Sequence, residues 1–256
     1  MTDILARTAE KRYGIKADPD LIKNLQKFVL ETYGNTDRNA VERVFDSGAA
    51  ADFLTVKETY FFREPVHFIF LNNLLHLYKE SGIRICCAAV ATGCEAYSIA
   101  MLIEAYNRSM ERALTYHIDA FDISPRVIET ACLGGVYSER CLREDGNSFH
   151  VLTVPYLKKC SDGYMVNESI KKNISFFVHN LMDELPGKNY DIVFFRNAFI
   201  YFLPECRGLL LSNLSSALTA GGLLIMGVSE TAGVQHPKLQ SKNNGDIFYF
   251  EKISNR

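Results

Sequence analysis

The sequence predicts an α/β protein with a doubly wound, mostly parallel sheet and a small helical domain ahead of it. Short apolar runs alternate with helical patterns after residue 65, and uniformly apolar strands are typical of a parallel sheet covered on both faces. Before residue 54, apolar side chains recur only at helical spacing among charged ones. We therefore expect a helical domain at residues 1–56 and an α/β domain at residues 57–256.

The individual elements follow from local signals. In the helical domain, Asp18-Pro19-Asp20 predicts the start of the main helix and Gly34-Asn35 its end. The expected strands are residues 85–90, 116–123, 174–178, 191–195 and 223–228, with a last, antiparallel strand at 247–250. The expected helices are residues 66–79, 95–107, 125–133 and 204–218, the last closed by Gly221-Gly222.

One interval interrupts this alternation. The segment from Tyr137 to Lys172 is polar and contains the turn signals Asp145-Gly146-Asn147 and Asp162-Gly163. It also contains short alternating stretches such as Phe149 to Val154. We expect a small β-rich insertion at about residues 137–172.

Composition excludes several classes of protein. Lys and Arg total 28 against 30 Asp and Glu, which favours neither nucleic acid nor a membrane surface as a partner. The seven cysteines include no CxxC pair and no Cys/His ligand spacing, so we expect no metal and a reducing cytoplasm. Residues 1–30 lack an apolar signal region, and no later run is long enough to span a membrane. The protein is expected to be neither exported nor anchored.

In a doubly wound sheet the ligand lies across the carboxyl ends of the strands. After the first strand, Ala91-Thr92-Gly93 allows close backbone approach and precedes a helix whose N–H groups point into the crevice. Asp122 ends the next strand, about where such folds place an acid for ribose hydroxyls. The structural alternatives are an ordinary tight turn and a helix cap, a role that Ser124 is equally able to fill.

Three further segments fall at or near these strand ends. His179-Asn180-Leu181 offers an amide and an apolar side chain that would bracket an adenine, or an ordinary turn. Arg196-Asn197 and the phenol of Tyr201 follow another apolar run, although such a tyrosine is as often part of the core. Ahead of the sheet, the aromatic and charged segment 58–65 is either part of the site or an interdomain joint.

Together these segments resemble the chemotaxis receptor methyltransferase family of the CheR type, over most of the chain. The motifs that carry the resemblance are Glu58-Thr59-Tyr60-Phe61-Phe62-Arg63, Ala91 to Ala100, Asp122-Ile123-Ser124, Asn180-Leu181, Arg196-Asn197-Ala198-Phe199-Ile200-Tyr201-Phe202 and Gly227-Val228-Ser229-Glu230. The resemblance implies a Rossmann-like domain that binds S-adenosylmethionine and transfers its methyl group to glutamate side chains on the cytoplasmic signalling helices of chemoreceptors. It leaves S-adenosylhomocysteine as the product.

The resemblance also implies roles for individual residues. Arg63 and Tyr201 are the expected catalytic residues. The expected cofactor-binding residues are Thr59, Arg63, Glu95, Asp122, Asn180, Leu181 and Asn197. No catalytic base is needed, because a glutamate carboxylate is already ionised near pH 7.

Three residues depart from the family's usual pattern, namely Lys57, Cys94 and Ala96. These departures motivate one alternative, a cofactor-binding module without activity. A second alternative is a methyltransferase with another acceptor, for which the insertion at residues 137–172 is the discriminating feature. Among the cysteines, Cys86 and Cys87 are expected in the core and Cys94 facing the cofactor.

Overall fold

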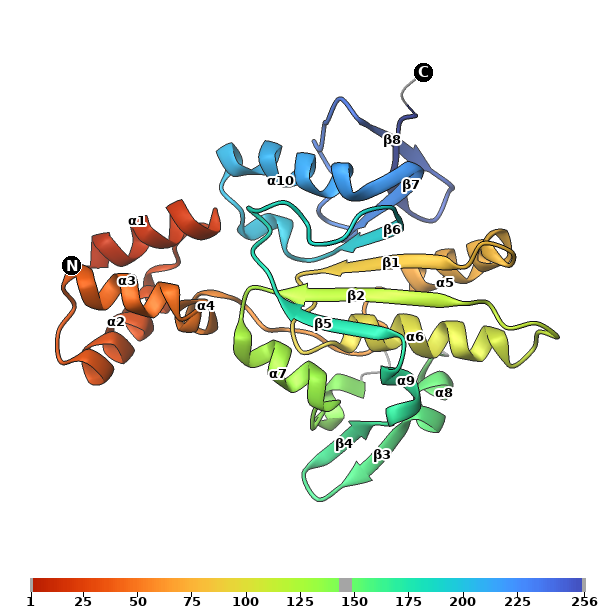
Figure 1. Ribbon diagram of the computed structural model, residues 1–256, viewed down its shortest axis with the longest axis horizontal. Helices are drawn as coiled ribbons and strands as arrows, with labels where there is room; N and C mark the ends of the chain where they lie inside the picture. Colours follow the sequence, from red (N-terminus) through yellow and green to blue (C-terminus); the bar gives the residue numbers. More distant parts are fainter. Residues whose placement is uncertain (1, 143–148, 255–256) are drawn as a thin grey trace.

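The computed structural model describes residues 2–142 and 149–254. Four helices at one end of the molecule begin the chain (Figure 1): α1 (Thr2–Tyr13), α2 (Pro19–Tyr33), α3 (Arg38–Asp46) and α4 (Ala49–Leu54). The side chain of Asp18 accepts hydrogen bonds from the backbone N–H groups of Asp20 and Leu21, and Gly34 ends α2 with a φ of 73°. Both predicted signals are confirmed.

The centre of the molecule is a seven-stranded sheet with the order β5-β2-β1-β6-β7-β9-β8. Its strands are β1 (Ile83–Ala88), β2 (Tyr116–Asp122), β5 (Ile174–Val178), β6 (Tyr190–Phe195), β7 (Leu218–Met226), β8 (Leu239–Asn243) and β9 (Phe248–Lys252). The first five in spatial order are parallel, whereas β9 runs antiparallel to both of its neighbours, β7 and β8. The predicted doubly wound fold and its last antiparallel strand are confirmed.

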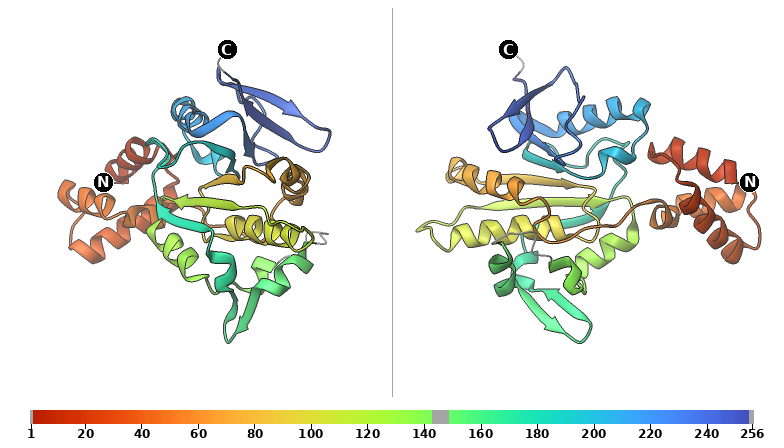
Figure 2. Two further views of the ribbon diagram at one scale, coloured as in Figure 1. Left: turned by 45° about the vertical axis from the view of Figure 1, so that its right-hand side comes forward. Right: turned by 180° about the vertical axis from the view of Figure 1, so that it is seen from behind.

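Helices cover the sheet on both faces (Figure 2). Helices α5 (Pro65–Leu74), α6 (Cys94–Asn107) and α7 (Pro125–Leu133) pack on one face, and α10 (Pro204–Ala217) packs on the other. A short 3-10 helix, η1 (Leu75–Tyr78), continues α5. Along β1, Ile85 and Cys87 contribute to one hydrophobic cluster and Cys86 to the other, as the pleat of a strand requires. Cys86 and Cys87 are fully buried, as expected.

The segment after α10 differs from the prediction. Gly221-Gly222 does not close the helix, because α10 ends at Ala217 and β7 begins at Leu218. Leu218 already pairs with Tyr190 of β6, and the register then shifts, with Gly221 at a φ of 75°. The glycines thus serve a bulge within the strand. Strand β8 was not predicted, because its sequence Leu-Gln-Ser-Lys-Asn is mostly polar at this exposed sheet edge.

The insertion contains the expected β structure in the antiparallel hairpin β3 (Leu157–Cys160) and β4 (Gly163–Val166). The other described elements of the insertion are helical: η2 (Glu139–Leu142), α8 (His150–Thr153), η3 (Val154–Tyr156) and α9 (Glu168–Lys171). The strand expected at 149–154 is wrong, because Phe149 and Leu152, spaced as in a helix, pack together against the core. The predicted turn at residues 145–147 lies outside the described residues.

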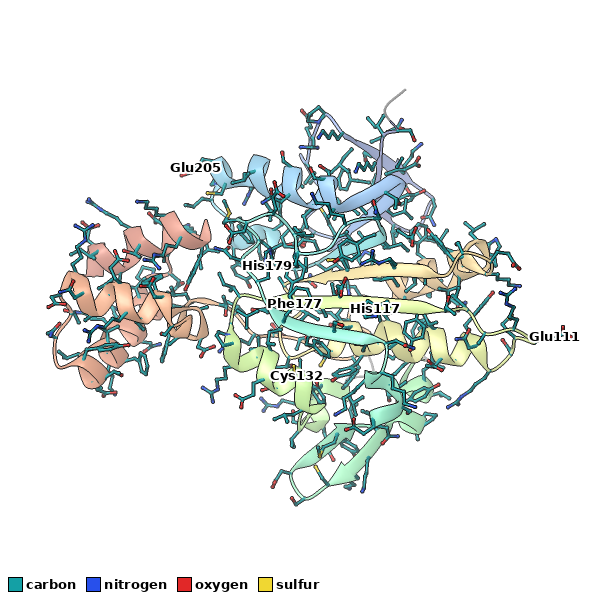
Figure 3. The ribbon with its side chains drawn as sticks, viewed as in Figure 1. Glu111, His117, Cys132, Phe177, His179 and Glu205 are labelled. Atoms are coloured by element: carbon teal, nitrogen blue, oxygen red, sulfur yellow. The ribbon has the colours of Figure 1, made fainter. Side chains whose placement is uncertain are left out.

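The strands run toward the N-terminal helices. Two side chains labelled in Figure 3 mark this direction. His117 lies near the start of β2, and His179, just after β5, lies on the side of those helices. The carboxyl ends of the parallel strands are therefore covered by the beginning of the chain.

Candidate active site

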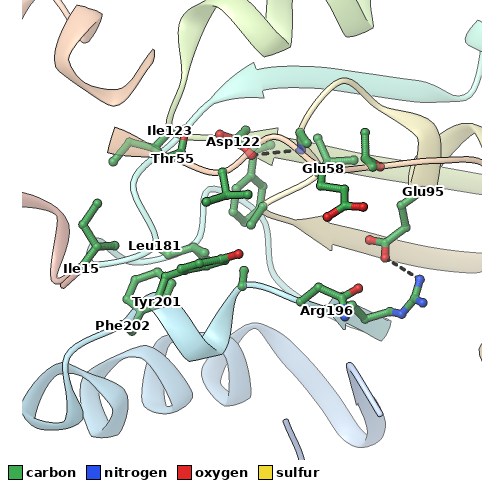
Figure 4. Close-up of a pocket in the computed structure, with 18 of the residues that line it drawn as sticks. Ile15, Thr55, Glu58, Glu95, Asp122, Ile123, Leu181, Arg196, Tyr201 and Phe202 are labelled. Atoms are coloured by element: carbon green, nitrogen blue, oxygen red, sulfur yellow. Dashed lines mark hydrogen bonds and ion pairs between the residues drawn. The ribbon is translucent and has the colours of Figure 1, made fainter. Parts of the chain in front are cut away.

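A pocket lies at the carboxyl ends of the parallel strands, where the strand order reverses between β1 and β6. Its walls come from the ends of β1, β2, β5 and β6, the segment before α5 and the segment after α1 (Figure 4). The structure brings all eight predicted site residues to this pocket: Thr59, Arg63, Glu95, Asp122, Asn180, Leu181, Asn197 and Tyr201.

The turn after β1 approaches the pocket through its backbone. Ala89 and Ala91 have positive φ values of 62° and 51°, and Gly93 has a φ of 91°. A Cβ atom on Gly93 would lie 3.0 Å from the Ala131 Cβ and 3.1 Å from the Tyr97 ring. Glycine is required here because both the conformation and the packing against α7 exclude a side chain.

Asp122 ends β2, and its carboxylate is hydrogen-bonded to the protein backbone. Its oxygens accept hydrogen bonds from the backbone N–H of Ala91 and of Ser124, both at 3.0 Å. Burial raises the pKa of Asp122, although these hydrogen bonds oppose the shift. The hydroxyl of Ser124 caps α7 by accepting from the Val127 N–H. The cap role thus falls to Ser124, and Asp122 lines the pocket.

In the opposite half of the pocket, the buried Arg196 forms ion pairs with two carboxylates. Arg196 donates to the Glu95 carboxylate at 3.0 Å and lies 3.3 Å from the Glu64 carboxylate, with its side chain only 2% exposed. Burial raises the pKa of Glu95, and Arg196 opposes that rise. For Glu64, burial is outweighed by Arg196 and the hydrogen bonds it accepts, so its pKa is lowered. The sequence placed Arg196 at a strand end but did not show these ion pairs.

Asn197 holds the end of β6 rather than offering a free amide. Its side-chain nitrogen donates to Glu64 at 2.8 Å, and its backbone N–H donates to Glu230 at 2.6 Å, with a φ of 57°. Glu230 also accepts from the N–H groups of Gly227 and Ile200. The turn singled out at residues 227–230 therefore buttresses this wall.

The side-chain amide of Asn180 is likewise hydrogen-bonded within the protein. Its side-chain nitrogen donates to the Arg12 carbonyl at 2.7 Å, and its side-chain oxygen accepts from the Met182 N–H at 3.0 Å. Leu181 is buried and contributes an apolar surface. Of the two side chains expected to bracket an adenine, Leu181 presents an apolar surface to the pocket, whereas the Asn180 amide is bound to the N-terminal helices.

Arg63 and Tyr201 also present polar side chains to the pocket. Arg63 donates to the Glu58 carbonyl at 2.9 Å and lies over the Tyr60 ring, and in the described residues it forms no ion pair. Tyr201 is 38% exposed, so it is not a core tyrosine.

The departures from the family pattern lie outside the pocket lining. Lys57 directs its ammonium to the Asp52 carbonyl at 2.8 Å. Cys94 is fully buried, so the expectation that it faces the cofactor is wrong. It occupies the first position of α6, where its side chain contacts Thr59 rather than the pocket. Ala96 is buried as well.

No sequence motif pointed to two further lining residues, Tyr13 and Ile15, which come from the start of the chain. Figure 4 shows Ile15 near Leu181, Tyr201 and Phe202, opposite the Glu95 and Arg196 end. The pocket therefore has an apolar half and a charged half. This division fits S-adenosylmethionine, which carries an aromatic base at one end and a charged amino acid group at the other. Fold and pocket together define an S-adenosylmethionine-dependent methyltransferase.

Comparison with known proteins gives the family. The model of the CheR methyltransferase SAM-binding domain matches residues 57–248, and the chain belongs to this family. Chemotaxis protein methyltransferases of Vibrio parahaemolyticus and Borreliella burgdorferi are both 36% identical to it, over 72% and 70% of this chain and 68% and 66% of their own lengths. A relative from Pseudomonas aeruginosa, named a probable biofilm formation methyltransferase, is 30% identical over 80% of this chain and 49% of its own.

A solved magnesium protoporphyrin IX methyltransferase from Synechocystis with bound S-adenosylmethionine shares 15% identity, over 74% of this chain and 80% of that one, with a TM-score of 0.38. This likeness is too low to bear on function. In the described ranges, every helix is too short or too polar to cross a bilayer.

Proposed function

We propose that this enzyme methylates glutamate carboxylates of chemotaxis receptors, forming the methyl esters used in sensory adaptation. The observation that carries the proposal is Arg63. It is a guanidinium at the pocket without an ion pair in the described residues, whereas Arg196 is bound by Glu64 and Glu95. An available guanidinium suits an acceptor that arrives as a carboxylate, because the two groups form paired, charge-assisted hydrogen bonds.

The charge state of the acceptor explains why the site needs no catalytic base. When bound, S-adenosylmethionine supplies an electrophilic methyl group on a sulfonium sulfur. The glutamate carboxylate, with an ordinary pKa of about 4.3, is already a nucleophile at pH 7 and needs no base. The protein's contribution is to hold the two reactants in line without water, which supplies roughly 7–11 kcal/mol in favourable cases. Arg63 and Tyr201 are the proposed catalytic residues because they face the pocket and remain available.

The remaining roles concern the cofactor. We assign the ribose hydroxyls to Asp122, because its carboxylate lines the pocket and has acceptor capacity left after two backbone hydrogen bonds. Leu181 would pack on the adenine, and Thr59 and Glu95 would bind the amino acid end, while Arg63 is assigned to the acceptor. Asn180 and Asn197 would act by fixing the two strand ends, since their amides bind the Arg12 carbonyl and Glu64.

The proposed partners are the cytoplasmic signalling helices of chemoreceptors, and the proposed location is the cytoplasm. The relatives named as chemotaxis methyltransferases support the partner. The seven cysteines, all free thiols, suit a reducing compartment. The relative named for biofilm formation favours a second candidate, the same chemistry on the carboxylate of another signalling protein.

The test is transfer of labelled methyl groups. The enzyme is incubated with methyl-labelled S-adenosylmethionine and membranes that contain chemoreceptors. We expect label on the receptor that mild base releases as methanol, the signature of a carboxyl ester. Label on a different protein would favour the second candidate, and tight cofactor binding without any transfer would contradict both.

A further inference from the structure

The backbone is strained on both sides of Arg63. Phe62 and Glu64 have φ values of 55° and 56°, in the left-handed region that residues with bulky side chains rarely adopt. Such conformations persist only where the surrounding contacts over-determine them, and they concentrate at functional sites. The contacts that hold residues 62–64, the Arg63 turn, therefore bear on the function of the arginine itself.

A serine of α6 holds the first residue of the Arg63 turn. The Phe62 N–H donates to the Ser98 hydroxyl at 2.9 Å, and this hydroxyl donates in turn to the Cys94 carbonyl at 2.7 Å. Ser98 is fully buried. The Phe62 ring is held as well, because it stacks on the Phe149 ring with 5.0 Å between the centroids. Helix α6 therefore fixes the place where the Arg63 turn begins.

The carboxylate of Glu64 holds the last residue of the turn. It accepts hydrogen bonds from the Asn197 side chain at 2.8 Å and from the Val228 N–H at 3.2 Å. It also pairs with the Arg196 guanidinium at 3.3 Å, and that guanidinium donates to the Arg63 carbonyl. The segments after β6 and β7 are thus joined to the Arg63 turn through one side chain.

We propose that Ser98 and Glu64 are positioning residues for methyl transfer, which hold the Arg63 guanidinium toward the acceptor carboxylate. Arg63 lines the pocket, whereas Ser98 and Glu64 are not among the lining residues, so they act through the Arg63 turn. The Arg63 side chain contacts the Glu58 carbonyl and the Tyr60 ring, both in its own short segment, so the direction of the guanidinium follows that of the turn. The inference rests on the acceptor role proposed above for Arg63.

Ser98→Ala removes the acceptor of the Phe62 N–H without adding bulk. One hydrogen bond corresponds to roughly a two- to tenfold effect, so we expect single-turnover methyl transfer to receptor membranes to be about fivefold slower at saturating S-adenosylmethionine. Affinity for S-adenosylhomocysteine should stay within about twofold. Ser215→Ala is the matched control, because Ser215 is an equally buried helical serine, in α10, whose hydroxyl donates to the Ser212 carbonyl at 3.1 Å. Its transfer rate should be unchanged.

A double-mutant cycle tests whether the serine acts through the arginine. In an Arg63→Ala background, Ser98→Ala should cause no further loss, because the guanidinium that it positions is gone. Glu64→Gln, which keeps the size of the side chain and removes its charge, gives a second cycle with the same expectation. Its control is Glu104→Gln in α6, since the Glu104 carboxylate accepts from the Tyr116 hydroxyl at 2.8 Å and should not affect the rate.

Each cycle decides for its own residue. Losses that add to that of Arg63→Ala would overturn the positioning role, and so would a Ser98→Ala rate equal to that of Ser215→Ala. A loss of S-adenosylhomocysteine affinity as large as the loss of rate would also overturn it, because the residue would then support the cofactor site in general. If Ser98→Ala does not fold, the Glu64→Gln cycle decides. Absence of transfer to receptors by the unsubstituted chain would refute the proposed function together with the positioning that rests on it.

Discussion

Replacing Asp122 with alanine should weaken cofactor binding strongly while the protein remains folded. Asp122 is 9% exposed, and its carboxylate accepts hydrogen bonds from the backbone N–H groups of Ala91 and Ser124. Hydrogen bonds to a charged group contribute about 1.5–3 kcal/mol each. Loss of both proposed ribose hydrogen bonds should therefore weaken S-adenosylhomocysteine binding by about 3 kcal/mol or more, which is at least ~100-fold.

The same substitution leaves two backbone N–H groups without their acceptor, so a stability control is needed. We expect a loss of about 1–3 kcal/mol in the free energy of unfolding. Helix α7 should persist because its cap is Ser124 and not Asp122. Asp122→Asn, which keeps the size and one acceptor oxygen, should give an intermediate affinity. Chemical denaturation measures the stability, and calorimetry well below the midpoint measures the affinity.

A thermodynamic cycle with two ligands and two proteins tests whether Asp122 binds the ribose. S-adenosylhomocysteine and its 2′-deoxy analogue are titrated into the unsubstituted chain and into Asp122→Ala. If the carboxylate binds the 2′-hydroxyl, removal of that hydroxyl should cost affinity in the first protein and little in the second. An equal cost in both proteins, or unchanged affinity of Asp122→Ala, would refute the reasoning.

Three further predictions concern turnover and pH. Arg63→Ala should lower kcat at least tenfold at saturating cofactor, since a charge-assisted contact of about 1.5–3 kcal/mol to the acceptor is lost; single-turnover transfer measures this, and normal turnover would contradict it. Tyr201→Phe should lower kcat about fivefold with an unchanged melting temperature, as expected for one hydrogen bond from an exposed phenol. Burial lowers the pKa of His67 to about 3, so the folded protein binds fewer protons than the unfolded chain below pH 6.5. The free energy of unfolding should therefore fall by up to about 1.4 kcal/mol per pH unit as pH drops from 6.5 toward 3, and denaturation of His67→Gln should show a shallower dependence than the unsubstituted chain. Equal slopes would exclude His67 as the cause.

The residue pattern alone predicts the order of the parallel strands, the helices between them and the residues at the strand ends. Uniformly apolar runs predict buried parallel strands, and the topology then places Asp122 and Arg196 at one crevice whatever the details of packing. Local capping chemistry was equally readable, as Asp18 and Gly34 show. These features depend on residues that are neighbours in sequence or on a rule common to all doubly wound sheets.

Which side chains at the crevice form ion pairs and hydrogen bonds within the protein depends instead on tertiary packing. It bound Arg196 to two carboxylates and the Asn180 amide to a carbonyl of α1, and it left Arg63 without an ion pair in the described residues. It also brought Ile15 to the pocket from more than 160 residues before Leu181 in the chain. Such contacts arise from the packing of distant elements, which no local period or spacing encodes. The same reason explains the error at residues 149–154, where packing on the core selected a helix over the alternation that suggested a strand.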